Sequence, residues 1–114
     1  MKIGLKRVYD VPAKGDGCRV LVDRLWPRGL SKKSTKVDYW IRDVAPSTPL
    51  RKWFAHDPAK WAEFKKRYFR ELKEHADAVK QIQSLAKQGK VTLLFGARDE
   101  KRNNAVALKA YLAR

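Results

Sequence analysis

The chain has 114 residues and a formal net charge of +15, because 27 Lys and Arg residues stand against 12 Asp and Glu residues. This length fits one domain, residues 1–114, and an aromatic content of 11% excludes a disordered basic tail. The single cysteine excludes a disulfide framework, and no segment approaches the roughly 18 apolar residues of a membrane-spanning helix, so we expect a soluble, cytoplasmic protein with no membrane partner.

The first half of the chain contains three candidate strands. Residues 3–9 alternate apolar with polar or basic side chains and predict a half-exposed strand, followed by a turn over residues 10–17. Residues 19–23 form a short apolar run that predicts a buried central strand. A polar loop follows over residues 24–29, where Pro27 prevents further ladder pairing. Residues 31–45 fit a strand or a helix, and we favour an edge strand.

The second half alternates helices with one more strand. Ser47 or Thr48 is suited to cap a short helix that runs through Phe54. Residues 58–74 predict the longest helix, with an apolar stripe every three or four residues that we interpret as core. A helix over residues 76–88 should end at Gly89 in a left-handed cap. A buried strand over residues 91–95 and a last helix beginning near residue 103 complete the chain.

These elements predict an α/β fold. We expect a small single-domain sandwich, with a short, partly parallel sheet of three to four strands packed by about four helices. In such folds ligands bind beyond the carboxyl ends of the strands. The polar loops that follow the two buried strands are therefore predicted to converge on one site.

The residue types in these loops predict an anion site. Arginine forks and a helix N-terminus both match the oxygens of phosphate or carboxylate groups. Asp23, Asp99 and His56 are the candidates for catalysis, although each also has a structural interpretation: Asp23 pairing with Arg98 or a neighbour, Asp99 capping the last helix, and His56 completing a turn. The predicted anion- or substrate-binding residues are Arg24, Trp26, Arg28, Arg51, Trp53, Arg98 and Asn103.

Four segments resemble the YeaO-like family, a domain of unknown function (DUF488). They read Val-Leu-Val-Asp-Arg-Leu-Trp-Pro-Arg-Gly-Leu-Ser over residues 20–31, Val-Ala-Pro-Ser over 44–47, Leu-Arg-Lys-Trp-Phe over 50–54 before His-Asp-Pro over 56–58, and Leu-Leu-Phe-Gly-Ala-Arg-Asp over 93–99. The resemblance implies a small α/β fold with the loop after residue 22 as the family signature, and it implies no activity.

One departure from the family pattern bears on the chemistry. Such sequences usually read Asp-Glu-x-His-Asn-His after the last strand, whereas this chain has Arg102 and Asn104 at the two histidine positions and matches only Asn103 between them. A mechanism that needs a neutral imidazole there is not supported. An anion site does not need one.

The net charge supports a different function. The alternative function is binding to DNA or RNA through a basic helix face formed by Lys66, Arg67 and Arg70. It contrasts with a site that binds a small anionic molecule, either without reaction or as an enzyme. The histidines are isolated and no phosphate-binding loop is present, so we predict no metal and no cofactor. The expected partners are an anionic small molecule or phosphate and, non-specifically, DNA or RNA, and the sequence does not define an oligomeric state.

Overall fold

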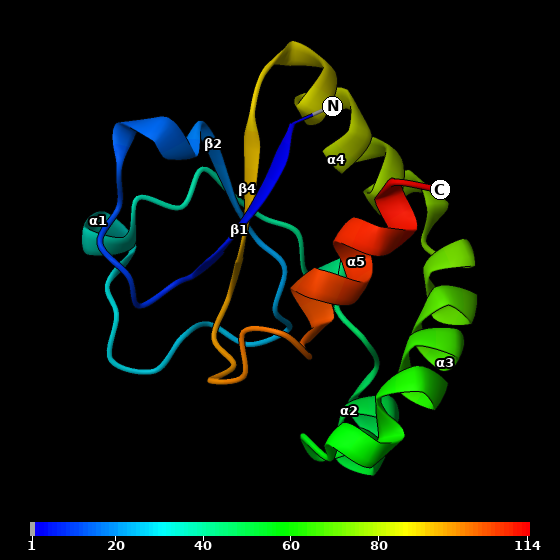
Figure 1. The fold of residues 1–114 in the computed structure, drawn as a ribbon. Helices are drawn as coiled ribbons and strands as arrows, with labels where there is room; N and C mark the ends of the chain where they lie inside the picture. The colour runs from blue at the N-terminus through cyan, green and yellow to red at the C-terminus, as the bar shows by residue number, and fades with distance from the viewer. Residues whose placement is uncertain (1) are drawn as a thin grey trace.

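The protein is built on a four-stranded sheet in the order β1–β4–β2–β3, and every neighbouring pair is parallel. The computed structural model describes residues 2–114 (Figure 1). The strands are β1 (Ile3–Arg7), β2 (Cys18–Leu21), β3 (Tyr39–Trp40) and β4 (Val91–Phe95). The predicted α/β class is confirmed, and the sheet is parallel throughout rather than in part.

Four of the helices cover one face of the sheet (Figure 1). They are α2 (Thr48–Phe54), α3 (Trp61–Lys73), α4 (Ala76–Gln88) and α5 (Asn104–Leu112). Alternate strand residues such as Val20, Val22 and Leu93 point into this layer, because successive side chains of a strand face opposite sides of the sheet. The stripe predicted on α3 supplies the buried Phe64, Tyr68 and Leu72 as core residues.

The opposite face is covered by the loop after β2 and by the short helix α1 (Lys32–Thr35). A second apolar cluster forms there around Val8, Leu21 and Leu94. Trp26 and Trp40 pack against this cluster in an edge-to-face pair with ring centroids 5.4 Å apart. The chain therefore leaves β2 toward one face of the sheet and leaves β4 toward the other, where α5 packs.

Several predicted boundaries need correction. Residues 31–45 form an edge strand over Tyr39–Trp40 only, because Ser31 caps α1 by accepting a hydrogen bond from the Ser34 N–H and a 3-10 turn occupies Arg42–Val44. The left-handed cap at Gly89 is wrong, since that residue is extended with φ 166°. The helix predicted over residues 58–74 begins as a 3-10 turn, Pro58–Lys60, and a further 3-10 turn, Lys14–Asp16, lies in the loop before β2. None of the helices within residues 2–114 is long and apolar enough to cross a bilayer.

Candidate anion-binding site

A cleft of about 400 Å³ lies where the chain leaves β2 and β4. These strands are adjacent in the sheet and their connections go to opposite faces, which is the position where ligands bind in parallel α/β sheets. The cleft is also bordered by α2 and by the start of α5. Its ionisable lining residues are Asp23, Arg24, Arg51, Lys52 and His56.

Asp23 joins three parts of the fold at this cleft. Its Oδ2 accepts a hydrogen bond of 2.8 Å from the Gly96 N–H, in the turn after β4. Its Oδ1 accepts one of 3.0 Å from Nδ2 of Asn104, which also donates to the carbonyl oxygen of Val22. The predicted pairing of Asp23 with Arg98 or a neighbour is not found as an ion pair within residues 2–114, because the neutral donors of Gly96 and Asn104 hold the carboxylate instead.

Burial raises the pKa of Asp23 above its ordinary value, since a charged carboxylate is costly away from water. The hydrogen bonds from Asn104 and Gly96 and the positive charge of Arg51 oppose this rise. The charged carboxylate is thus stabilised by two neutral hydrogen-bond donors and by the nearby guanidinium of Arg51. It forms no direct salt bridge among the described residues.

The cationic side chains of the cleft come from two elements. Arg24 follows β2, and its guanidinium donates to the carbonyl oxygens of Ala45 at 3.3 Å and Pro46 at 3.4 Å. Arg51 and Lys52 are exposed residues of α2. In residues 2–114, none of these three side chains forms an ion pair with a carboxylate.

The position of α2 is set by α3. Ser47 caps α2 by accepting a hydrogen bond from the Leu50 N–H, as predicted from its residue type. Glu71 of α3 accepts hydrogen bonds from the backbone N–H and the hydroxyl of Ser47, at 2.8 and 2.6 Å. The buried Tyr68 hydroxyl donates to the carbonyl oxygen of Val44 in the preceding turn. Together these contacts hold the segment that presents Arg51 to the cleft.

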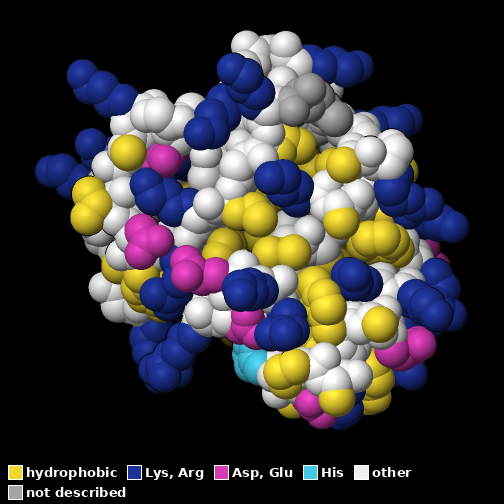
Figure 2. Space-filling model, viewed as in Figure 1, with side chains coloured by type: hydrophobic (Ala, Val, Ile, Leu, Met, Phe, Trp, Pro, Cys, Tyr) yellow, Lys and Arg dark blue, Asp and Glu magenta, His cyan; other side chains and the backbone are white. Residues whose placement is uncertain are grey.

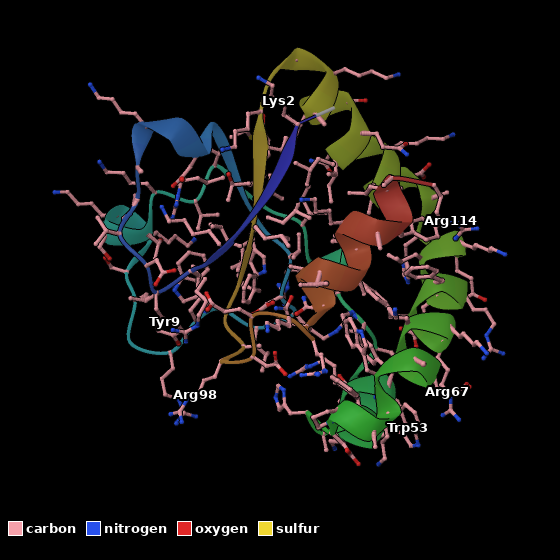
Figure 3. All side chains as sticks on the ribbon, in the orientation of Figure 1. Lys2, Tyr9, Trp53, Arg67, Arg98 and Arg114 are labelled. Carbon is pink, nitrogen blue, oxygen red and sulfur yellow. The ribbon has the colours of Figure 1, made fainter. Side chains whose placement is uncertain are left out.

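Five of the predicted site residues do not line the cleft. Trp26 packs on the other face of the sheet, and its indole N–H donates to the Leu30 carbonyl oxygen. Arg28 is exposed. Figure 3 shows Arg98 pointing away from the molecule beyond the end of β4. The same view shows Trp53 beside Arg67 at the outer surface of the helical layer, with the guanidinium 4.1 Å from the ring centroid.

Asp99, the fifth of these residues, holds a turn. Its Oδ1 accepts hydrogen bonds from the N–H groups of Lys101 and Arg102, and the Lys101 contact is the main cause that lowers its pKa. The cap of α5 is Asn103, whose side chain accepts a hydrogen bond from the Val106 N–H, so the expectation that Asp99 caps this helix is wrong.

The remaining predicted residues, His56 and Asn103, do line the cleft, and so do residues that the sequence reasoning missed. Lys52, Thr48 and Phe54 are among these additions. Neighbouring residues of a helix point about 100° apart, so no sequence pattern indicated that both Arg51 and Lys52 border one cleft. Within residues 2–114, no three His, Cys, Asp or Glu side chains gather as a metal site would require.

Comparison with known proteins gives matches along the whole chain. Residues 2–114 match a family model described as "Inactive DUF488-N3 subclade". The uncharacterized protein YeaO of Escherichia coli K12 is 41% identical over 112 residues, which covers 98% of this chain and 97% of that protein. The uncharacterized protein Mb3100c of Mycobacterium bovis is 39% identical over 111 residues, or 97% of this chain and 93% of that protein. No solved structure matches the chain.

Proposed function

The chain belongs to the YeaO-like DUF488 family, and we propose that its cleft binds a small anionic ligand through a phosphate or carboxylate group. The observation that carries this proposal is the charge of the cleft lining, which contains three cationic side chains, Arg24, Arg51 and Lys52, and a single carboxylate, Asp23. Two donors of the Arg24 guanidinium are used by backbone carbonyls, and three of its five N–H groups remain for a ligand.

The surroundings of Asp23 favour binding over acid–base catalysis. Asn104 stands where the family pattern has its second histidine, and its side chain is one of the two donors to Asp23. An imidazole at that position could exchange a proton with the carboxylate, whereas the Asn104 amide donates a hydrogen bond to it without transferring the proton. The word "inactive" in the description of the matching family model agrees with this interpretation.

Calorimetric titration of the purified protein with inorganic phosphate, at low ionic strength, tests the proposal. Arg51→Ala should weaken phosphate binding about tenfold, because a charge-assisted hydrogen bond contributes roughly 1.5 kcal/mol or more. Arg98→Ala is the matched control, since it removes the same charge from an exposed loop outside the cleft. Equal affinities for wild type and Arg51→Ala, or equal losses in the two variants, would contradict the proposal.

Nucleic-acid binding is the second candidate, and the net charge of +15 favours it. The positive charge of the predicted helix face is partly neutralised, however. Oε2 of Glu63 lies 3.0 Å from Nε of Arg67 and 3.7 Å from Nη2 of Arg70. Figure 2 shows Lys and Arg side chains spread over the whole visible face rather than gathered in one patch. This distribution is typical of general attraction to polyanions and not of a single docking surface.

Measuring the affinity for a DNA duplex against salt concentration separates the two candidates. If the alternative holds, Arg67→Ala combined with Arg70→Ala should reduce the salt slope, while Arg51→Ala should leave duplex binding nearly unchanged. Duplex binding that disappears near physiological ionic strength, with no sequence preference, would count against a nucleic-acid function.

A further inference from the structure

The charge of the cleft identifies the kind of anion it fits. Three cationic side chains and one carboxylate leave an excess of about two positive charges. A phosphate monoester carries about −1.5 to −2 at neutral pH, whereas a simple carboxylate carries one negative charge. A phosphate monoester therefore compensates the excess charge of the cleft better than a monocarboxylate does.

Asp23 restricts the rest of the ligand. A carboxylate has about four acceptor positions, and the Gly96 N–H and the Asn104 amide occupy one position on each oxygen. The free acceptor positions of Asp23 repel an anionic group, so a ligand group that contacts them must be a hydrogen-bond donor. Hydroxyl groups supply such donors without adding charge.

The remaining lining fits a short carbon skeleton. Phe54 and Phe64, both buried, are among the lining residues, and so is Thr48. A volume of about 400 Å³ is at the small end of the usual range for ligand pockets, roughly 300–1,000 Å³. The cleft thus combines cationic side chains that compensate a phosphate, a carboxylate acceptor and apolar lining residues.

We propose that the ligand is a hydroxylated phosphate monoester of about sugar size, with its phosphate bound by the cationic side chains of the cleft and a hydroxyl group donating to Asp23. This inference rests on the proposed anion-binding function and specifies its ligand. A free sugar phosphate and a nucleoside monophosphate share this chemistry. The cleft volume leads us to commit to the sugar phosphate.

A matched pair of ligands tests the acceptor role on the wild-type protein. Glycerol 3-phosphate and propyl phosphate share the charged group and the three-carbon chain, and they differ in the two hydroxyl groups. We expect glycerol 3-phosphate to bind about tenfold more tightly, because a hydrogen bond to a charged acceptor exchanges water for a fixed partner. If propyl phosphate binds equally well, the hydroxyl preference is refuted while the anion site stands. If neither compound nor inorganic phosphate binds, the proposed function itself fails.

Substitution of the acceptor gives the second measurement. In Asp23→Asn the ratio of the two affinities should fall from about ten to about one, whereas Arg98→Ala should keep the wild-type ratio. A ratio that survives in a folded Asp23→Asn variant would overturn the role of Asp23. Should that variant not fold, the ligand pair on wild type still decides the proposal. Ribose 5-phosphate and adenosine monophosphate distinguish the sources: comparable affinities support the sugar phosphate, and much tighter binding of the nucleotide overturns that commitment.

Discussion

Gly96 is predicted to be the position where one added methyl group disturbs the cleft most directly. Its backbone N–H donates to Oδ2 of Asp23 at 2.8 Å. A Cβ at this residue would lie 3.2 Å from the same oxygen and 3.8 Å from Cε2 of Tyr9. The first of these contacts is tighter than ordinary van der Waals contact, so in Gly96→Ala the carboxylate must move by a few tenths of an ångström.

The carboxylate cannot move freely, because Oδ1 is held by Asn104 at 3.0 Å. Gly96→Ala should therefore weaken at least one hydrogen bond to a charged group, at a cost of about 1 kcal/mol or more. Any Gly→Ala change also lowers the entropy of the unfolded chain, which stabilises the fold by about 0.4–1 kcal/mol. Gly15→Ala is the matched control, because it has this second effect and no atom lies within 4 Å of its Cβ.

Urea unfolding of both variants isolates the contact at Asp23. With a slope of roughly 1–3 kcal/mol per molar urea, the midpoint of Gly96→Ala should lie about 0.5 M below that of Gly15→Ala. Gly15→Ala itself should match or exceed the wild type. Equal midpoints, or a higher midpoint for Gly96→Ala, would refute the claim that Gly96 and the Asp23 carboxylate are in close contact.

Three further predictions concern stability. Tyr68→Phe should cost about 1–3 kcal/mol in urea unfolding, because the buried Val44 carbonyl loses its donor; an unchanged midpoint would show that this bond does not hold the turn. Gly17→Ala should cost about 2–3 kcal/mol, since Gly17 has φ +65° and its Cβ would overlap the Lys90 carbonyl; a wild-type midpoint would contradict this conformation. Because the folded state holds the proton of Asp23 more tightly than the unfolded state, this group stabilises the fold below its ordinary pKa of 3.8, and that contribution is lost as pH rises through the raised value. The free energy of unfolding of wild type, taken relative to Asp23→Asn, should therefore fall from acidic to neutral pH. If this difference rises with pH instead, the pKa of Asp23 is lowered in the folded state and not raised.

Local patterns were sufficient for the regular elements of the fold. The boundaries of α4 and β4 agree with the predicted ranges 76–88 and 91–95, because periodicity and flanking polar residues define both elements. The conformation of residues 31–45 is harder to predict, since it depends on the Ser31 cap and on Lys36, which ends α1 in the left-handed region with φ 49°. Such a conformation at a lysine is not visible in any hydrophobic pattern.

The site was predictable in its location but not in its lining. Asp23 and Arg24 follow a buried strand, so the sequence placed them at the edge of the sheet where the cleft lies. The sequence analysis predicts Arg51 and Trp53 in the same pocket, yet residues two apart on a helix point about 200° apart. Arg51 borders the cleft, while Trp53 lies under Lys60 and Arg67 on the outside. Helical periodicity distinguishes these two faces, but only the tertiary structure shows which one meets the cleft.

The cost of keeping the Asp23 carboxylate charged links the stability of the fold to the kind of ligand that the cleft prefers. Its carboxylate is partly desolvated, which raises its pKa and makes the charged form costly when only the Gly96 and Asn104 donors face it. A ligand hydroxyl would add a third donor, and a ligand phosphate would neutralise the cations nearby. Because Asp23 joins the exits of β2 and β4 to the start of α5, each added contact strengthens the link between these elements. Binding that depends on Asp23 should therefore also stabilise the fold, by an amount set by the ligand concentration relative to its dissociation constant.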